Sequence, residues 1–424
     1  MKFYIETYGC QMNIADSELI STILIEAGHQ LVNNIDEADL IIFNTCSVRE
    51  HAENRVLGRI ASEKYRKTSN PDLKIAVIGC MAQRMGKRLI ENYSVDYVAG
   101  VDQYLDFPKL IQENKGAITD PDYTQTYSGI RPHHQSRTCA YITIMRGCNN
   151  FCSYCIVPYV RGRERSLPAE LIIEEVKRCG EKGLKDITLL GQNVNSYAYQ
   201  DVNFPKLLGL LNDMDSIYRI RFITSHPKDL SDELIEVMAE CSKICEHIHL
   251  PLQSGDNDIL LAMNRNYTIE HYINIVNKLR KAIPDIAITT DVMTGFPGES
   301  ETAFNHTLQA MRQIQFDYAF CFKYSPRVNT KAADLPDQIP EEIRLERLKK
   351  MVILQREISK NKYEAKIGSK VEIYVESLSK KSAHQVSGKT RDFKIAVLDG
   401  TERDLGTLKK AQVLASTGST LLCG

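Results

Sequence analysis

The sequence predicts a three-domain α/β protein, because three kinds of pattern follow one another along its 424 residues. Apolar runs alternate with amphipathic stretches over residues 1–112, and six further strand patterns alternate with helical ones over 138–363. Short strands separated by turns fill residues 364–424, and a stretch without periodicity separates the first two regions. A chain of this length also exceeds what one hydrophobic core usually organises.

The first region has the order strand, helix, strand, helix, strand. Its strand candidates are "KFYIETYG", "ADLIIFNTC" and "LKIAVIGC", with the amphipathic "SELISTILIEAGHQ" and a long charged helix between them. This order predicts a flavodoxin-like parallel α/β domain. Residues 113–137 gather Pro, Gly and polar residues, so we interpret them as a linker in which His133 and His134 are exposed to solvent.

The second region carries six strand candidates with helical patterns such as "PAELIIEEVKRCGEKG" between them. Six βα units predict a partial (βα)6 TIM-like barrel that is open by two strands, with the functional loops after the strand C-termini. A helix over 341–363 leads to the last region, which predicts a small β-barrel. The strand candidates are 141–144, 187–190, 220–224, 247–250, 286–291 and 318–324.

Composition narrows the setting in which the protein works. The formal net charge is -1, with 25% charged and 43% hydrophobic residues, which is ordinary for a soluble globular protein and indicates no class of partner. The N-terminal "MKFYIETYGC" is a strand pattern and no long uncharged apolar stretch occurs, so we expect a cytoplasmic protein that is neither exported nor membrane-spanning. Its twelve cysteines should then stay reduced, and clustered ones are expected to bind metal.

Three cysteines, Cys148, Cys152 and Cys155, form a Cys-x3-Cys-x2-Cys loop directly after the first barrel strand. A structural zinc site takes four ligands, so three thiolates fit a 4Fe-4S cluster better and leave one iron without a protein ligand. A fragment of a zinc site and a chance spacing are the alternatives. The spacing is similar to the defining motif of the radical S-adenosylmethionine (SAM) superfamily. That resemblance implies that the open iron holds the amino and carboxylate groups of SAM.

A second set of cysteines, Cys10, Cys46 and Cys80, is scattered in sequence, but each residue stands at the end of an apolar strand. The C-termini of parallel strands share one edge of a sheet, so the three thiols can converge there. For one such residue alone, the alternative is a cysteine that simply packs well in a buried strand. Taken together, the three residues predict a second 4Fe-4S cluster, again with one iron that lacks a protein ligand.

The two cysteine sets and the residues around them resemble the methylthiotransferases, a family within the radical SAM superfamily. The resemblance extends from Tyr4 to the C-terminal "LLCG", and it implies an auxiliary cluster in the N-terminal domain and a TRAM domain at the C-terminus. "GQNVNSY" and "RGRERS" are most similar to the branch that modifies tRNA already carrying an isopentenyl group. The motifs that carry the resemblance are "TYGCQMN", "NTCSVRE", "GCMAQR", "RGCNNFCSYCIVPYVRGRERS", "LLGQNVNSY" and "LPLQSG".

The loops after the barrel strands are candidates for contacts with SAM or the substrate. "TDVMTGFPGE" resembles the superfamily's Gly-containing segment that approaches the adenosyl part of SAM, where glycine permits close approach of the backbone. Each polar residue of these loops could instead serve only to form a turn. The candidate SAM-binding residues are Gln192, Asn193, Ser225, Gln253, Asp291, Thr294, Gly295 and Gly298.

Basic residues in two places are candidates for RNA contacts. The last 59 residues hold ten Lys or Arg against six Asp or Glu, and a small basic β-barrel can contact RNA phosphates. The arginines after the cysteine loop could bind phosphates near the target base, or could pair with Glu164 and the SAM carboxylate. The candidate RNA-binding residues are Arg161, Arg163, Arg165, Lys380, Lys381, Lys389 and Arg391.

The resemblance also implies a reaction and its partners. Reductive cleavage of SAM would give a 5'-deoxyadenosyl radical that removes hydrogen from carbon 2 of N(6)-isopentenyladenosine at tRNA position 37. That carbon offers no acidic proton, so general-base chemistry would not suffice. The auxiliary cluster would carry the sulfur, which a second SAM methylates, so both cysteine sets are catalytic. The implied partners are the tRNA anticodon loop, an electron donor such as flavodoxin or ferredoxin, and a sulfur donor or cluster-repair protein; we expect the chain to be a monomer.

Other interpretations stay open at this point. The family also includes enzymes that methylthiolate threonylcarbamoyl-adenosine in tRNA or an aspartate of a ribosomal protein, and "GQNVNSY" argues against them by resemblance alone. An iron-sulfur RNA-binding or redox-sensing protein without turnover is the non-enzymatic alternative. The open iron implied by each cysteine set argues against it, because electron-transfer and structural clusters normally take four protein ligands.

Overall fold

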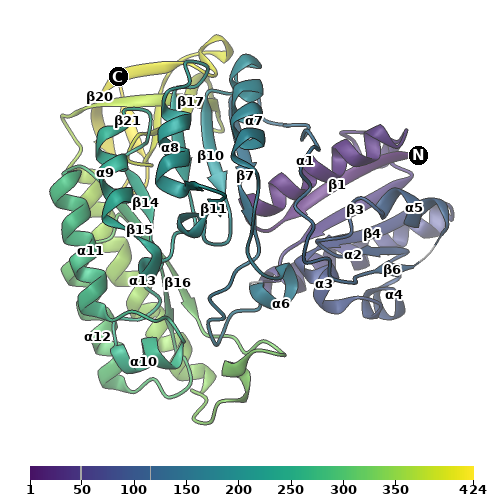
Figure 1. Ribbon diagram of the computed structural model, residues 1–424, viewed down its shortest axis with the longest axis horizontal. Helices are drawn as coiled ribbons and strands as arrows, with labels where there is room; N and C mark the ends of the chain where they lie inside the picture. Colours follow the sequence, from purple (N-terminus) through teal and green to yellow (C-terminus); the bar gives the residue numbers. More distant parts are fainter. Residues whose placement is uncertain (48–49, 115) are drawn as a thin grey trace.

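The computed structural model describes residues 1–47, 50–114 and 116–424 of the chain. Figure 1 shows an N-terminal α/β part in purple and blue, a central barrel in teal and green, and a C-terminal barrel in yellow. The predicted fold class is confirmed. Among the described residues, no helix combines the length and the apolar character that crossing a bilayer requires.

The N-terminal part is a six-stranded parallel sheet in the order β2-β1-β3-β4-β5-β6. Its central strands β3 and β4 are nearly unbroken apolar runs because hydrophobic clusters cover both faces of the sheet. The strands are β1 (Lys2–Tyr8), β2 (Gln30–Leu31), β3 (Leu40–Thr45), β4 (Lys74–Gly79), β5 (Tyr97–Ala99) and β6 (Ala117–Ile118), and the helices are α1 (Gln11–Glu26), α2 (Glu50–Ser69), α3 (Cys80–Met85), α4 (Arg88–Tyr93) and α5 (Phe107–Gln112).

Residues 113–137, predicted to be a linker, contribute to the packing of the N-terminal part. Strand β6 lies in this segment, and the ring of Tyr127 stacks on that of Tyr104 with centroids 5.5 Å apart. The expectation that His134 is exposed was wrong, because only 4% of its side chain is accessible. A strand of two residues and single anchoring side chains leave no periodic pattern, so the sequence indicated only an irregular connection.

The central part contains the six predicted parallel strands in two sheets, β13-β10-β7 and β14-β15-β16. A parallel bridge between Ile220 and Ile244 connects them, so β7 and β16 are the two edges of an open barrel with helices outside (Figure 1). The strands are β7 (Cys139–Thr143), β10 (Asp186–Leu190), β13 (Arg219–Phe222), β14 (His247–His249), β15 (Ala287–Thr294) and β16 (Tyr318–Lys323), and the longer helices are α7 (Ala169–Glu181), α8 (Phe204–Asn212), α9 (Asp232–Glu240), α11 (Ile269–Ala282), α12 (Glu301–Ile314) and α13 (Glu341–Glu364).

Short elements lie in the loops at the C-terminal ends of the barrel strands, where the cysteine loop also lies. They are β8 (Met145–Arg146), α6 (Val157–Arg161), β9 (Arg165–Ser166), β11 (Ala198–Tyr199), β12 (Val202–Asn203) and α10 (Asn257–Ala262). Helix α13 then leads into a closed five-stranded barrel in the order β17-β18-β19-β21-β20, as predicted. Its strands are β17 (Lys370–Ser379), β18 (Ser382–Thr390), β19 (Ile395–Asp399), β20 (Leu408–Ser416) and β21 (Leu421–Cys423).

The turn between β18 and β19 packs against the end of the central barrel at which its strands begin. The ring of Phe393 stacks on His247 with centroids 4.3 Å apart, and the guanidinium of Arg221 lies 5.5 Å from the same ring. Lys394 forms a buried ion pair with Asp317 at 2.8 Å. The C-terminal barrel therefore covers the base of the central barrel, and the opposite end, with the strand C-termini, carries the candidate site.

Candidate active site

The cysteines of the N-terminal sheet lie at the ends of three neighbouring strands. Cys10 follows β1, Cys46 follows β3, and Cys80 begins α3 directly after β4. The last residues of these strands are paired with one another in the sheet. The structure therefore brings the three residues to one edge, although Val48 and Arg49 of the motif "NTCSVRE" lie outside the described residues.

Small residues and a buried amide pair let these strand ends approach one another. Gly9 has φ +149°, and a Cβ built on it would lie 2.9 Å from Cβ of Cys46 and 2.2 Å from Oδ1 of Asn13. The Nδ2 group of Asn13 donates to Oδ1 of Asn44 at 2.9 Å, which ties the start of α1 to β3. Any side chain at position 9 would have to displace the Asn13 side chain and Cys46.

The cysteines of the barrel loop lie between β8 and α6. The backbone N–H of Cys148 donates to the Gly162 carbonyl at 3.0 Å, and that of Cys155 donates to Cys152 at 2.9 Å. Gly147 precedes the loop with φ +79°, and a Cβ there would lie only 1.9 Å from the Arg163 carbonyl oxygen. Burial raises the pKa of Cys148 to about 11 and that of Cys155 to about 12, so binding a metal group must release their protons.

The spacing of the sulfur atoms distinguishes between metal groups. Among the described residues, neither cysteine set brings all three of its sulfur atoms within 4.8 Å of one another. One tetrahedral zinc ion, with Zn–S bonds of about 2.3 Å, would draw its thiolates to about 3.8 Å apart. A larger iron-sulfur cluster held by three thiolates fits both sets better than a single zinc ion.

Each cysteine set also receives a hydrogen bond from a buried arginine. Nε of Arg161 donates to Sγ of Cys80 at 3.2 Å, and Nη1 of Arg265 donates to Sγ of Cys152 at 3.4 Å. Burial raises the pKa of the Cys80 thiol, Arg161 lowers it, and the neighbouring Cys10 thiol raises it again. Both arginines place positive charge where thiolate ligands would be negative. No local spacing in the sequence indicated the role of Arg265.

Asp16 of α1 connects the two cysteine sets. Its buried carboxylate forms ion pairs with Arg146 of β8 at 2.9 Å and with Arg161 of α6 at 2.8 Å. Burial alone would raise the pKa of Asp16, but the two arginines lower it below its usual value. Cys80 packs against Ile156, which directly follows the last cysteine of the barrel loop. The two sets therefore border one buried interface between the N-terminal sheet and the barrel.

Four SAM-binding candidates lie in the loops after β10, β13 and β14. Oε1 of Gln192 accepts a hydrogen bond from the N–H of Gly147, at the base of the cysteine loop. Within the part of the chain that the structure describes, Oδ1 of Asn193, Oγ of Ser225 and Oε1 of Gln253 are buried without a hydrogen-bond partner. Buried polar atoms in this state normally meet a ligand or water, so they suit the polar groups of a bound cofactor.

The other four candidates lie on β15 and the turn after it. Thr294 Oγ1 donates to the buried Glu299 carboxylate at 3.0 Å, and the N–H of Gly295 donates to the same oxygen at 2.7 Å. The N–H of Gly298 donates to a backbone carbonyl at 3.0 Å. A carboxylate oxygen of Asp291 lies 3.5 Å from Nε2 of His249 in β14. These polar groups of Thr294, Gly295 and Gly298 are engaged within the turn and shape the loop, and their contact with SAM stays a prediction.

Among the arginines expected to contact RNA after the cysteine loop, the structure distinguishes three situations. Arg161 is only 4% exposed and is occupied by Asp16 and Cys80, so it presents no surface to a phosphate. Arg165 pairs with Asp102 at 3.0 Å. The exposed Arg163 lies with its guanidinium 4.2 Å from the ring centroid of Phe151. Arg163 keeps an accessible charge near the cysteine loop.

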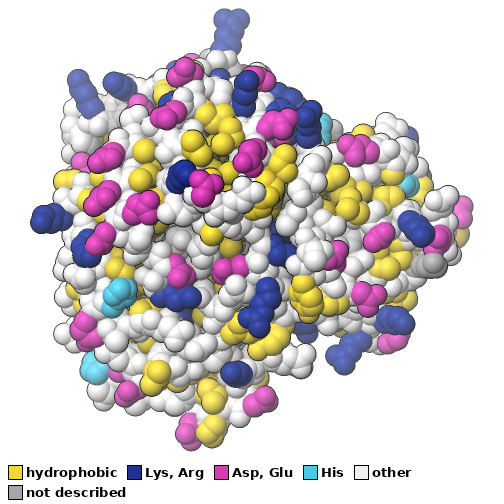
Figure 2. All heavy atoms as spheres, in the orientation of Figure 1, with side chains coloured by type: hydrophobic (Ala, Val, Ile, Leu, Met, Phe, Trp, Pro, Cys, Tyr) yellow, Lys and Arg dark blue, Asp and Glu magenta, His cyan; other side chains and the backbone are white. Residues whose placement is uncertain are grey.

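The basic candidates of the C-terminal barrel also differ in their surroundings. Lys389 pairs with Glu376 at 2.9 Å, and Arg391 pairs with Glu246 of the central barrel at 2.7 Å, next to the turn that covers the barrel base. Lys380 and Lys381 are exposed at the turn between β17 and β18. Acidic and basic side chains are mixed over the face in Figure 2. Lys389 and Arg391 therefore make contacts within the chain, and their RNA role stays a prediction.

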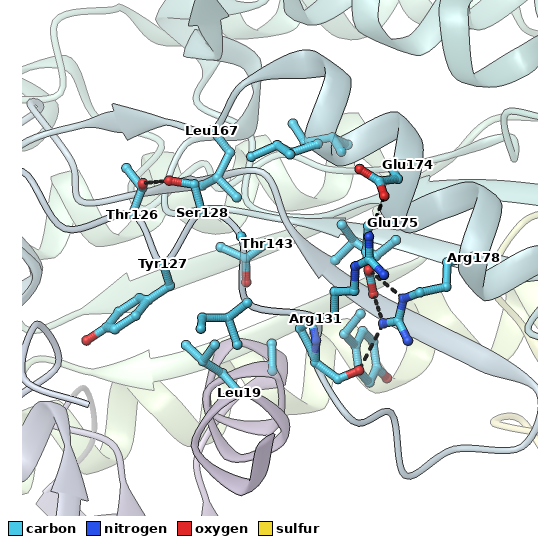
Figure 3. A pocket seen from close by; sticks show the side chains of 18 of the residues that line it. Leu19, Thr126, Tyr127, Ser128, Arg131, Thr143, Leu167, Glu174, Glu175 and Arg178 are labelled. Atoms are coloured by element: carbon cyan, nitrogen blue, oxygen red, sulfur yellow. Dashed lines mark hydrogen bonds and ion pairs between the residues drawn. The ribbon is translucent and has the colours of Figure 1, made fainter. Parts of the chain in front are cut away.

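A cavity of about 200 Å³ lies between α1, residues 126–134 and α7 (Figure 3). Beside it, the two ring nitrogens of His134 lie 2.8 Å from the carboxylates of Glu18 and Glu175. Burial alone would lower the pKa of His134, but hydrogen bonds with Cys179, Glu175 and Glu18 raise it to about 11. The imidazolium donates to both carboxylates and so joins the N-terminal part to the barrel.

The fold and the two cysteine sets define a radical SAM protein with a second cysteine site. A family model described as Radical SAM superfamily matches residues 142–311, and one described as Uncharacterized protein family UPF0004 matches residues 2–100. The fold is similar to that of the radical SAM methyltransferase TsrM from Kitasatospora setae, with a TM-score of 0.61 and 14% identity over 78% of this chain and 77% of that one. It is also similar to OxsB, a cobalamin-dependent SAM radical enzyme, with a TM-score of 0.55 and 12% identity over 84% and 56%.

Full-length relatives are much more similar. A protein of Thermoanaerobacter sp. (strain X514) is 46% identical over 99% of this chain and 91% of its own length. One of Porphyromonas gingivalis is 44% identical over 99% and 94%. Both are named tRNA-2-methylthio-N(6)-dimethylallyladenosine synthase, and the chain belongs to this family. The predicted family is confirmed, and with it the use of SAM and 4Fe-4S clusters.

Proposed function

We propose that the protein is a tRNA methylthiotransferase that converts N(6)-isopentenyladenosine at position 37 to 2-methylthio-N(6)-isopentenyladenosine. The observation that carries this proposal is the buried interface between the two cysteine sets, where Arg161 contacts both Asp16 and Cys80. A reaction that needs both a radical and a sulfur source requires the two sites to lie near one another. The names of the near full-length relatives support isopentenylated tRNA as the substrate.

The six cysteines are the proposed cluster ligands. Each set offers three thiolates, which leaves one iron of a 4Fe-4S cluster open to a small ligand. When bound, the barrel cluster and SAM supply radical chemistry, which a ring carbon without an acidic proton requires. The barrel cluster ligands are Cys148, Cys152 and Cys155; the auxiliary cluster ligands are Cys10, Cys46 and Cys80; and the SAM contacts are Asn193, Ser225 and Gln253, with Gln192 positioning the cysteine loop.

The remaining groups of the site hold the cysteine sulfurs and bind and orient the tRNA. Arg265 and Arg161 hold one sulfur of each set and place positive charge beside it. The target base has to leave the anticodon loop to enter the open barrel, because an enzyme cannot reach a ring carbon within a stack. Lys380, Lys381 and Arg163 are the proposed phosphate contacts. The proposal also includes two protein partners: an electron donor such as flavodoxin or ferredoxin, and a sulfur donor or cluster-repair protein. It further includes a monomeric state and a cytoplasmic location.

The direct test is an anaerobic incubation of the reconstituted protein with SAM, a reductant and tRNA, followed by mass spectrometry of the nucleosides. Three tRNA preparations are compared: isopentenylated, threonylcarbamoylated and unmodified at position 37. We expect a methylthio product from the isopentenylated tRNA alone, and none from a Cys148→Ala variant. Product from the threonylcarbamoylated tRNA alone would overturn the proposed substrate. Cleaved SAM with no tRNA product would direct attention to an aspartate of a ribosomal protein.

A further inference from the structure

Strand β16 carries a row of three aromatic side chains, Tyr318, Phe320 and Phe322. Tyr318 is 50% exposed and Phe320 is 42% exposed, while Phe322 is half-buried. The rings of Tyr318 and Phe320 meet edge to face with centroids 4.8 Å apart. Those of Phe320 and Phe322 are nearly parallel, at 6° and 6.4 Å. Three adjacent aromatic rings with this exposure form a continuous apolar surface that single exposed side chains do not.

This aromatic row faces the interior of the open barrel. The alternate residues Ala319 and Cys321 pack on the hydrophobic core outside the strands, which includes Met351 of α13. Phe320 pairs in register with Asp291 of β15, so their side chains point to the same side of the sheet. The ring of His249, from β14, lies edge to face with Phe320 at 6.1 Å. The row therefore lines the barrel wall at its free edge, because β16 is an edge strand.

The segment after β16 leads from this wall to both cysteine sites. The N–H of Ala332 donates to the carbonyl of Ser153, between two cysteines of the barrel loop, at 2.8 Å. Arg327 pairs at 3.2 Å with Glu53, whose carboxylate also accepts a hydrogen bond from Ser47, directly after Cys46. Phe322 is the member of the row nearest to this segment along the chain, so a group bound at that end of the row lies beside the segment that contacts both sites.

We infer that the aromatic row of β16 is the surface on which the extruded adenine and its isopentenyl group bind, and that it selects prenylated over carbamoylated adenosine. The inference rests on the proposed function. Aromatic side chains stack on the π-face of any base, and a branched alkenyl group gains further from apolar contact. A threonylcarbamoyl group carries a carboxylate, which would meet the carboxylate of Asp291 on the same wall. Apolar surface beside an acidic group suits the first substituent and disfavours the second.

The test measures binding of the anaerobic holoenzyme to anticodon stem-loop RNAs that carry isopentenyladenosine, threonylcarbamoyl-adenosine or adenosine at position 37. The variants are Phe320→Ala, Phe320→Leu and Tyr318→Ala. Tyr65→Ala is the matched control, because Tyr65 is an exposed aromatic residue of α2, away from the barrel. Iron content and thermal unfolding show that each variant is folded and loaded.

We expect Phe320→Ala to weaken binding of the isopentenylated RNA by about 5- to 150-fold, the range for the loss of one stacking ring. In Phe320→Ala, the ratio of the affinity for the isopentenylated RNA to the affinity for the unmodified RNA should fall toward one. Phe320→Leu should give an intermediate ratio, and Tyr65→Ala should keep the wild-type ratio. Wild-type ratios in both Phe320→Ala and Tyr318→Ala would overturn the inference. If the wild-type enzyme methylthiolates isopentenylated tRNA and the variants keep wild-type ratios, only the inference about the aromatic row fails. If the wild-type enzyme forms no methylthio product on that tRNA, the proposed function fails, and the inference fails with it.

Discussion

The Nε atom of Arg161 lies 3.2 Å from the sulfur of Cys80, although 81 residues separate them in the chain. Hydrogen bonds and positive charge at a ligand sulfur stabilise the reduced state of an iron-sulfur cluster. We therefore expect Arg161→Gln to lower the reduction potential of the auxiliary cluster by on the order of 100 mV, the equivalent of a charged hydrogen bond. Redox titration followed by electron paramagnetic resonance measures both clusters.

The matched control removes the corresponding arginine beside the other cysteine set. Arg265→Gln removes the donor to Cys152 and should lower the potential of the barrel cluster instead. Arg163→Gln removes an exposed charge near the cysteine loop and should alter neither potential appreciably. Equal shifts of both clusters in Arg161→Gln and Arg265→Gln would contradict the assignment of one arginine to each site.

Asp16 should be essential to the stability of the interface between the sheet and the barrel. Asp16→Asn leaves the buried Arg146 and Arg161 without their carboxylate, and breaking a buried ion pair in this way costs about 3–5 kcal/mol. Denaturant unfolding of the anaerobic holoprotein measures the loss. Asp201→Asn is the control, because Asp201 pairs with Lys206 at the surface and its removal should change stability little. Equal stability of the two variants would argue against the Asp16 interface.

His134 should make stability depend on pH. Its pKa is raised from 6.5 to about 11, so its contribution is complete below pH 6.5 and is lost as the pH rises toward about 11. Burial alone would raise the pKa of Glu175, but His134 and Arg178 lower it from 4.5 to about 2. The contribution of Glu175 to stability is therefore present above pH 4.5 and is lost as the pH falls toward 2. The difference in unfolding temperature between wild type and His134→Gln should be largest at pH 4.5–6.5 and should shrink at higher pH.

A control for this titration is His271→Gln, since His271 is exposed on α11. Its unfolding temperature should follow that of the wild type at every pH. A difference for His134→Gln that is constant from about pH 6 to about pH 10 would show that the imidazole is neutral in the folded protein.

The exposed lysines of the C-terminal barrel should contribute to tRNA affinity through phosphates. Replacing Lys380 and Lys381 together by Gln should make the negative slope of log K against log salt shallower by about one for each phosphate that the variant no longer binds. Arg391→Gln should leave this slope unchanged and lower stability, because Arg391 pairs with Glu246 inside the chain. Filter binding over a salt series measures the slopes, and an unchanged slope in the double variant would remove these lysines from the RNA surface.

The sequence was informative wherever a pattern is local. Each strand and the helix that follows it show their own spacing of apolar residues. The cysteines at the ends of β1, β3 and β4 could be predicted to converge, because parallel strands share an edge. The contacts of Arg161 with Cys80 and Asp16 span 81 and 145 residues and have no local signature. For the same reason the sequence did not show that Arg391 pairs with Glu246 of the central barrel.

The central claim is that the two cysteine sets perform different steps of one reaction. The most direct measurement uses the triple variant Cys10→Ala, Cys46→Ala and Cys80→Ala, reconstituted and incubated anaerobically with SAM, a reductant and isopentenylated tRNA. We predict that SAM is still cleaved to 5'-deoxyadenosine while no methylthio nucleoside forms. A methylthio product at the wild-type level would contradict the account, because it would show that the sulfur does not come from the site of Cys10, Cys46 and Cys80.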